Sequence, residues 1–372
     1  MNIKGGWDIE LACKPHLDKN LERIYAWYEQ EVVDRPPIRF ISNNQVFRDS
    51  QEDPDVGPGK RWETYTDRWF DPEYRVSSFE KSLENTDEML GENLPIFWPD
   101  YSPNYLAGNY GCELKFDQTT GWVDGPILED YDNLEENLKF RWDGKLYKNS
   151  EALVKLALER CKGKFLVGFP DHNILGDCME AVRGTTNYLM DLYDEPDEVK
   201  KAHDIVTRDF LKSYDHFDEL IKKGGSMSCN WMGIPSFGKF YVPTADITAM
   251  FSTKMYEEFY FDTMDKVINR MDHTIYHMDG KDVAKHVDVL LEHKKLNGIQ
   301  WVQGMGNDRP ILQWVPLIKK IQRAGKSVIC DVDLEDLEEF ISEVRDPRGI
   351  FLFVEAHDTD LQKQIIKRIE KW

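Results

Sequence analysis

Residues able to bind a metal ion or move a proton stand at the ends of short apolar runs in the second half of the sequence. His277 and Asp279 are two positions apart, Cys330 ends another run, and Glu355 and His357 follow a third. Neutral imidazole, carboxylate and thiolate are all zinc ligands, and an open fourth position lets a substrate reach the metal. Residues i and i+2 of a strand point to the same side, so the spacing predicts that His277 and Asp279 converge on one cation.

The later ligand of this zinc site is either Cys330 or His357, and the sequence leaves that choice open. We expect Glu355 to orient a ligand or to act as a general base. The alternative is structural: Asp279 caps the helix that follows it, and His277 donates to a neighbouring carbonyl group. Cys330 follows apolar residues, and buried cysteine is commonly a small core residue.

Other polar residues close apolar runs elsewhere in the chain. Asp171 and His172 form a candidate acid–base pair, although adjacent strand residues face opposite sides, so at most one of them points into a site. Asn230, Trp231 and Gln303 are candidates to shape a substrate pocket. These positions form a site only if the fold gathers the ends of separate strands at one place.

Short apolar runs alternate with amphipathic helices downstream of about residue 150, a pattern typical of βα units and a parallel sheet. The runs expected to form strands are 165–169, 227–231, 274–277, 298–302, 327–330 and 350–354. Helices of 3.6-residue period follow each of the last four strands. Gly325 and Gly349 stand just past the second and third of these helices, where left-handed caps are expected.

We expect a (β/α)8 TIM barrel with an elaborated N-terminal region, a fold in which the residues just after each strand line the catalytic rim. Four strand–helix units in succession, two looser ones before them and an N-terminal strand at 38–41 come close to eight. An open, doubly wound sheet is the alternative. However, no GxGxxG follows any strand and no GxxxxGK[ST] occurs, so the usual nucleotide site of that fold is missing.

The first 150 residues are expected to elaborate a single barrel domain over 1–372, with regular βα units from 151 onward. Within this first part, a helix is predicted over 16–34, a long loop or lid over 44–75 and a β-hairpin over 111–126.

Composition and charge exclude several classes of protein. Acidic residues outnumber basic residues by 68 to 47, and the net charge of −21 repels phosphate backbones and anionic membranes. We therefore expect a small-molecule substrate, with no nucleic-acid or membrane partner. The sequence shows no secretory signal, and its six cysteines are widely spaced without a CxxC pair. These features predict reduced thiols and a cytoplasmic protein.

Four segments, in order, resemble the uroporphyrinogen decarboxylase superfamily. DCMEAVRGTTNYLMDLYDEP at 177–196 is similar to the segment in which an RG is followed by a DL and a (D/E)P. ADITAMFSTKMYEEF at 245–259 is similar to a later segment, with Thr253 in place of the usual proline. YHMDG at 276–280 resembles the H.(D/C)G strand end, and GIQWVQG at 298–304 resembles the next strand.

The resemblance implies a (β/α)8 barrel and two kinds of activity: cofactor-free decarboxylation of a porphyrinogen, or corrinoid-dependent methyl transfer. The arginine-rich RQAGR-type motif of the decarboxylases is absent from 37–44. A net charge of −21 is also unfavourable for a substrate with eight carboxylates. The chain is therefore nearer to the corrinoid-dependent methyltransferase branch.

In that branch a His-x-Cys pair and a later Cys hold zinc, which activates a thiol that takes the methyl group from methylcobamide. His277 matches the histidine and Asp279 stands at the first cysteine position, while Cys330 or His357 corresponds to the later ligand. Carboxylate in place of thiolate makes the metal more Lewis-acidic, which suits an oxygen substrate or bound water.

The resemblance thus implies a zinc-dependent, methyltransferase-like enzyme that works with a corrinoid (methylcobalamin as co-substrate) carried on a separate corrinoid protein. One alternative is a metal-free decarboxylase or lyase of a small carboxylic acid, with Asp171 or Asp279 acting against His172. The others are a glycoside hydrolase-type barrel with acidic pairs at strand ends, and a ligand-binding barrel without chemistry.

Overall fold

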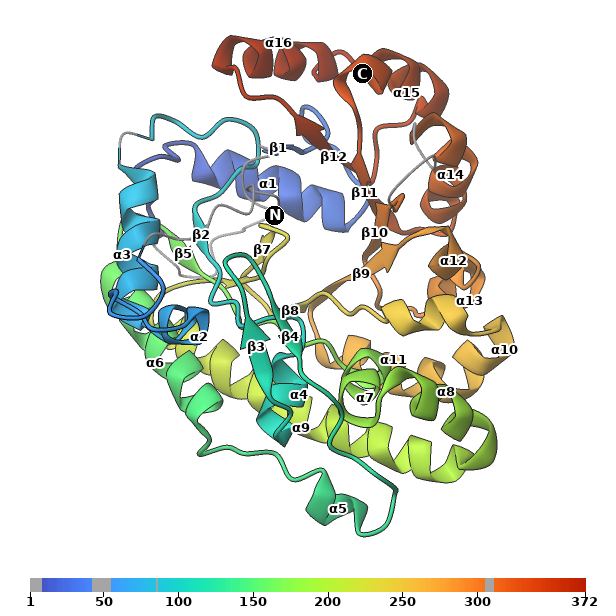
Figure 1. Cartoon of the computed structure of the whole chain (residues 1–372). Helices are drawn as coiled ribbons and strands as arrows, with labels where there is room; N and C mark the ends of the chain where they lie inside the picture. The colour runs from blue at the N-terminus through green and yellow to red at the C-terminus, as the bar shows by residue number, and fades with distance from the viewer. Residues whose placement is uncertain (1–8, 42–54, 85, 305–310) are drawn as a thin grey trace. The chain divides into compact units, whose positions relative to one another are not determined.

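The structure is a computed structural model that describes residues 9–41, 55–84, 86–304 and 311–372 (Figure 1). The chain divides into two compact units, and each is described by itself. Unit 1 comprises Met1–Gln45, Asn85–Pro95 and Gly233–Trp372; unit 2 comprises Val46–Glu84 and Ile96–Met232. Among the described helices, none combines the length and the apolar composition needed to cross a membrane.

Unit 1 holds most of the regular βα pattern. Its elements are α1 (Leu17–Tyr28), β1 (Ile38–Ile41), β7 (Pro235–Ser236), β8 (Phe240–Tyr241), η1 (Asp246–Met250), α10 (Thr253–Tyr256), the π-helix η2 (Glu257–Phe261), α11 (Asp262–Arg270), β9 (His273–Asp279), α12 (Lys281–Ala284), α13 (Val287–Glu292), β10 (Gly298–Val302), η3 (Ile311–Trp314), α14 (Val315–Arg323), β11 (Ser327–Asp331), η4 (Leu334–Asp336), α15 (Leu337–Val344), β12 (Ile350–Glu355) and α16 (Thr359–Ile369).

Unit 2 is mainly helical. Its elements are α2 (Tyr65–Trp69), α3 (Pro72–Leu83), β2 (Ile96–Phe97), α4 (Tyr105–Tyr110), β3 (Leu114–Phe116), β4 (Gly121–Val123), α5 (Leu134–Asn137), α6 (Lys145–Arg160), β5 (Leu166–Val167), α7 (Leu175–Arg183), α8 (Thr185–Asp194), α9 (Pro196–Lys223) and β6 (Ser228–Cys229).

The described parts of two predicted N-terminal segments lie in unit 2. The segment 44–75, expected as a long loop, is described only from residue 55 onward, and there it contains α2 and the start of α3. The segment 111–126, expected as a hairpin, contains β3 and β4, which pair antiparallel.

The strands of unit 1 form one six-stranded sheet in the order β1-β12-β11-β10-β9-β8, and every neighbouring pair is parallel. Parallel neighbours need a crossover, and helices supply it between β9 and β10, between β10 and β11, and between β11 and β12. The mixed α/β fold with a parallel sheet is therefore confirmed. Closure of eight strands into a barrel stays a prediction.

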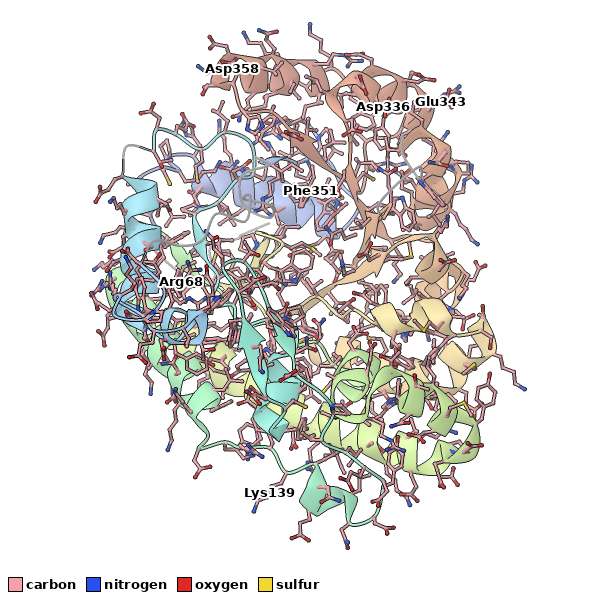
Figure 2. All side chains as sticks on the ribbon, viewed as in Figure 1. Arg68, Lys139, Asp336, Glu343, Phe351 and Asp358 are labelled. Carbon is pink, nitrogen blue, oxygen red and sulfur yellow. The ribbon has the colours of Figure 1, made fainter. Side chains whose placement is uncertain are left out.

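The register of this sheet decides which side chains share a face. His277, Gln300, Ile329 and Phe351 occupy one continuous row across β9 to β12. Figure 2 labels Phe351 next to α1, and Asp358 at the start of α16. The face that carries the His277 row is called the inner face below.

The opposite face of the same strands packs against helices. Met278, Trp301, Cys330 and Leu352 form a row there, and all four are fully buried. The ring of Trp301 lies 4.7 Å from that of Trp314 in η3. Strands with buried residues on both faces are typical of parallel sheets.

Helix α1 covers the inner face at the amino-terminal ends of the strands. The ring of Trp27 lies 5.3 Å from Phe351, and its Nε1 donates to the carbonyl oxygen of Gly349. Tyr28 stacks on His273 at 4.0 Å between ring centroids. Aromatic side chains of α1 therefore fill the amino-terminal end of the inner face.

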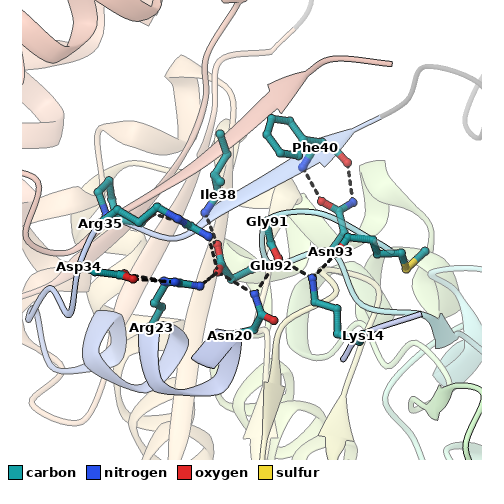
Figure 3. A network of polar contacts seen from close by, with 12 residues as sticks. Lys14, Asn20, Arg23, Asp34, Arg35, Ile38, Phe40, Gly91, Glu92 and Asn93 are labelled. Atoms are coloured by element: carbon teal, nitrogen blue, oxygen red, sulfur yellow. Dashed lines mark hydrogen bonds and ion pairs between the residues drawn. The ribbon is translucent and has the colours of Figure 1, made fainter. Parts of the chain in front are cut away.

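A buried carboxylate ties the N-terminal segments of unit 1 to β1 (Figure 3). Glu92 is fully buried, accepts two hydrogen bonds from Arg35 at 2.9 and 3.0 Å, and accepts a third from the backbone N–H of Ile38 at 2.7 Å. Asn20 and Arg23 of α1 donate to the same carboxylate. Because buried charges need such partners, this network fixes where β1 begins.

The free edge of β1 is protected by the next residue of the same segment. The side-chain amide of Asn93 donates to the carbonyl oxygen of Phe40 and accepts from the Phe40 N–H, each at 2.7 Å. This amide takes the place of the backbone of a neighbouring strand. It satisfies the N–H and the carbonyl group of Phe40, which could otherwise pair with another chain.

The two glycines expected as helix caps behave differently. Gly325 follows the end of α14 with φ +78°, as predicted. The prediction for Gly349 is wrong, because α15 ends at Val344 and its C-cap residue is Arg345, which adopts φ +69° and whose N–H donates to the carbonyl oxygen of Ile341. Gly349 also has positive φ, but it precedes β12, where a Cβ would lie 3.1 Å from the Gln30 side chain.

We predict that Glu92→Gln lowers the free energy of unfolding by about 3–5 kcal/mol, because it leaves the buried Arg35 guanidinium without a countercharge. Denaturant unfolding measures this loss. The matched control is Glu338→Gln, which removes an exposed ion pair with Arg368 and should cost less than about 1 kcal/mol. Equal losses for the two variants would contradict the role given to Glu92.

Candidate functional site

The candidate site lies at the carboxyl ends of the unit 1 strands, on the inner face. His277 is half-buried there, and its Nδ1 lies 2.7 Å from Oε1 of Gln300, its direct register partner on β10. An amide oxygen only accepts, so Nδ1–H donates and the neutral ring keeps its lone pair on Nε2. Gln300 thus fixes the ring orientation and presents a base at the site.

Asp279 lies on the same face as His277, because β9 stays extended through Asp279. The alternative role as a helix cap is not adopted, since Gly280 is the residue that precedes α12. Burial raises the pKa of Asp279; the nearby His277 lowers it, and the nearby carboxylate of Asp246 raises it. The site therefore favours the protonated form of Asp279 more than water does.

Asp246 lies near Asp279 and belongs to η1, which follows β8. Its Oδ1 accepts a hydrogen bond from the Thr244 hydroxyl at 2.8 Å, and the neighbouring Pro243 carbonyl accepts the backbone N–H of His277 at 2.9 Å. The start of η1 is thus held beside β9, which places a second carboxylate near Asp279.

Arg39 and Asp331 extend the inner face toward β1. The register aligns Asp331, Phe353 and Arg39 in one row, and the guanidinium carbon lies 5.4 Å from the centroid of the Phe353 ring. Burial lowers the pKa of Arg39 to about 10, and the charge of Asp331 opposes this shift. This desolvated guanidinium beside a carboxylate is a further candidate for the site, and no motif in the sequence points to it.

Cys330 is on the other face of the sheet. It pairs in register with Trp301, which faces the helices, and it is fully buried. Burial raises the pKa of its thiol well above the usual value, and the adjacent Asp331 acts in the same direction. The structure therefore does not bring Cys330 to His277, because its thiol is buried on the face that packs against the helices.

Glu355 and His357 remain close to each other at the end of β12. His357 Nε2 lies 3.0 Å from Glu355 Oε1, and both side chains are exposed. Within the described ranges, no three His, Cys, Asp or Glu side chains gather in a way that could hold a metal ion. The described residues thus do not fit the predicted three-ligand zinc site, and no step below passes through zinc.

Gln303 directly follows β10, so it lies at the same end of the sheet as Asp279. It is 6% exposed, and its Nε2 lies 3.5 Å from the carbonyl oxygen of Asp331. Its Oε1 is buried and has no hydrogen-bond partner among the residues the structure describes. A buried oxygen without a hydrogen-bond partner can accept a hydrogen bond from a ligand or from water.

The predicted acid–base pair Asp171 and His172 belongs to unit 2. His172 is 2% exposed, with Nδ1 2.7 Å from the Pro170 carbonyl oxygen and Nε2 3.0 Å from the Ser213 hydroxyl. Burial lowers the pKa of His172 to about 4, and the Pro170 carbonyl acts weakly in the opposite direction. Both ring nitrogens are engaged inside the unit, which is the environment of a structural histidine.

Asn230 and Trp231 also lie in unit 2, just after β6. Asn230 is buried, and its side-chain oxygen accepts the backbone N–H of Met232 at 3.1 Å, so this side chain shapes a local turn. Trp231 is half-buried.

Comparison with known proteins gives a fold relative. No protein-family model matches the sequence, and no curated protein matches it. Among solved structures, the chain is similar to a methyltransferase from Methanosarcina mazei, with a TM-score of 0.58 and 11% sequence identity over 97% of this chain and 99% of that one. At this identity the likeness establishes a shared fold over nearly the whole length.

We predict that Gln300→Leu releases the His277 ring from its single tautomer, because Leu offers no acceptor to Nδ1–H. Nitrogen-15 NMR of histidine-labelled protein at a pH where the ring is neutral should show Nδ1 protonated in the parent chain. In the variant, protonation should shift toward Nε2. An unchanged spectrum would mean that Gln300 does not orient the ring.

Burial of His172 makes the stability of the protein depend on pH. The neutral form of this residue is favoured by the fold, so it stabilises the protein above about pH 6.5, and this contribution is lost as the pH falls toward 4. The destabilisation caused by His172→Asn should therefore shrink by on the order of 3 kcal/mol between pH 7 and pH 4. Unfolding free energies of the parent chain and of His172→Asn, measured across this pH range, test the prediction. A difference between the two proteins that does not change with pH would contradict it.

Proposed function

We propose that the chain is a methyltransferase that exchanges a methyl group between a small molecule and a corrinoid. The observation that supports this most is the shared fold with a methyltransferase over 97% of the chain, together with polar groups collected at the carboxyl ends of parallel strands. Catalytic groups of α/β folds with parallel strands stand at this end.

When bound, a corrinoid supplies or receives the methyl group. In either direction the protonation of the substrate heteroatom changes. The heteroatom loses a proton as the methyl group arrives, and it gains a proton as the methyl group leaves. We assign that proton to Nε2 of His277, since Gln300 holds the proton of the neutral ring at Nδ1.

The surrounding residues add further polar groups to the site. Asp246 and His277 both lie close enough to Asp279 to act on its carboxylate. Gln303 offers an acceptor to an O–H or N–H of the substrate. These groups together favour a substrate that donates hydrogen bonds, such as an alcohol or an amine.

The test is a methyl-transfer assay with methylcobalamin. Under anaerobic conditions, purified protein is mixed with methylcobalamin and a panel of small alcohols, amines and thiols. The loss of methylcobalamin absorbance is then followed. We expect protein-dependent conversion with at least one class. His277→Ala should lower the rate by about 100-fold or more, the usual contribution of a proton-transfer group.

Cys330→Ala serves as the matched control, because the thiol faces the helices and not the site. Its rate should remain within a few-fold of that of the parent chain. If no member of the panel is converted, or if His277→Ala retains the parent rate, the proposed function is wrong.

A further inference from the structure

A second polar site lies at the opposite end of the unit 1 sheet. A cavity of about 340 Å³ is lined by residues just before three strands: Asp272 before β9, Asn297 before β10 and Lys326 before β11. The end of α1 forms another wall. The cavity is therefore at the amino-terminal ends of the strands, away from the carboxyl ends that carry His277.

Lys326 is the unusual residue of this cavity. It is 7% exposed, and its ammonium group donates to the carbonyl oxygens of His293 at 2.9 Å and Lys294 at 3.0 Å. These two contacts satisfy two of its three N–H groups without neutralising the charge. The structure gives Lys326 no carboxylate partner among the residues it describes, and burial lowers its pKa. Lysine is rarely buried so deeply unless it is paired with an anion.

Two further lysines line the same cavity. Lys294 and Lys295 are exposed, and Lys295 donates to the carbonyl oxygen of Asn269 at 3.2 Å. The acidic residues on the wall are Glu29, which is exposed, and Asp272, whose carboxylate accepts the backbone N–H of Lys239 at 2.7 Å. Three lysines and two acidic residues therefore line the cavity, a local excess of positive charge in a chain with a net charge of −21.

We propose that this cavity binds a small phosphate-bearing molecule, with Lys326 as the buried countercharge and Lys294 and Lys295 at the entrance. A phosphate dianion matches several ammonium groups better than a monovalent carboxylate does, and lysine binds phosphate as a point charge. The volume is at the lower end of small-molecule sites, which leaves room for more than inorganic phosphate alone. The binding site is independent of the proposed methyl transfer.

Isothermal titration of the full chain at constant ionic strength tests this, with inorganic phosphate as the probe and acetate as the carboxylate comparison. We expect saturable phosphate binding, and binding of acetate weaker by about tenfold or more. Lys326→Met should weaken phosphate binding by at least about tenfold, while Lys320→Gln should leave it unchanged. Lys320 is the matched control because it is a half-exposed lysine of the same unit, paired with Asp288 outside the cavity.

Absence of saturable phosphate binding by the parent chain, or undiminished binding by Lys326→Met, would overturn the proposal. If Lys326→Met does not fold, the double variant Lys294→Gln/Lys295→Gln replaces it, since both side chains are exposed. That variant should also bind phosphate more weakly, and equal affinity would count against the site.

Discussion

The in-register pairing of parallel strands in unit 1 is the constraint on which the candidate site depends. Side chains alternate between the two faces of a strand, so the pairing of β9 with β10 decides that His277 meets Gln300. The same pairing places Cys330 with Trp301 against the helices. A slip of one residue in any strand would move its whole polar set to the other face, so the chemistry and the core packing are specified together.

The edges and ends of the sheet are held by residues distant in sequence. Glu92 and Asn93 bind the backbone of β1 at Ile38 and Phe40, and in doing so they fix the position of Arg39 between them. Helix α1 fills the inner face at the amino-terminal ends through Trp27 and Tyr28. Burial of these groups leaves the carboxyl ends as the part of the inner face that carries polar side chains.

Much of the fold was predictable because it follows from local patterns. The strand at 298–302 and the strand at 38–41 have the predicted bounds, since apolar runs flanked by turn residues identify buried strands. The end of α14 at Gly325 follows from the positive φ that glycine adopts readily. Gly349 does not cap α15 because Arg345 takes that position, which depends on tertiary contacts and not on a local pattern.

The site was only partly predictable, because it depends on which strands are neighbours. The i, i+2 spacing placed His277 and Asp279 on one face, but nothing local reveals that Gln300 stands opposite His277. Cys330 was chosen for its chemistry, whereas its neighbour Asp331 occupies the inner face. Arg39 carried a usable signal, since a charged residue inside the apolar strand IRFI has to face a polar environment. Asp246 had no comparable signal, because it enters from a short helix after β8.

The position of a bound substrate is the most direct test of the central claim that chemistry occurs beside His277. A crystal structure of the chain with the alcohol, amine or thiol that supports methyl transfer would give this position. We expect the substrate heteroatom within hydrogen-bond distance of His277 Nε2, on the inner face at the ends of β9 and β10. A substrate bound elsewhere, with His277 and Gln303 untouched, would contradict this claim.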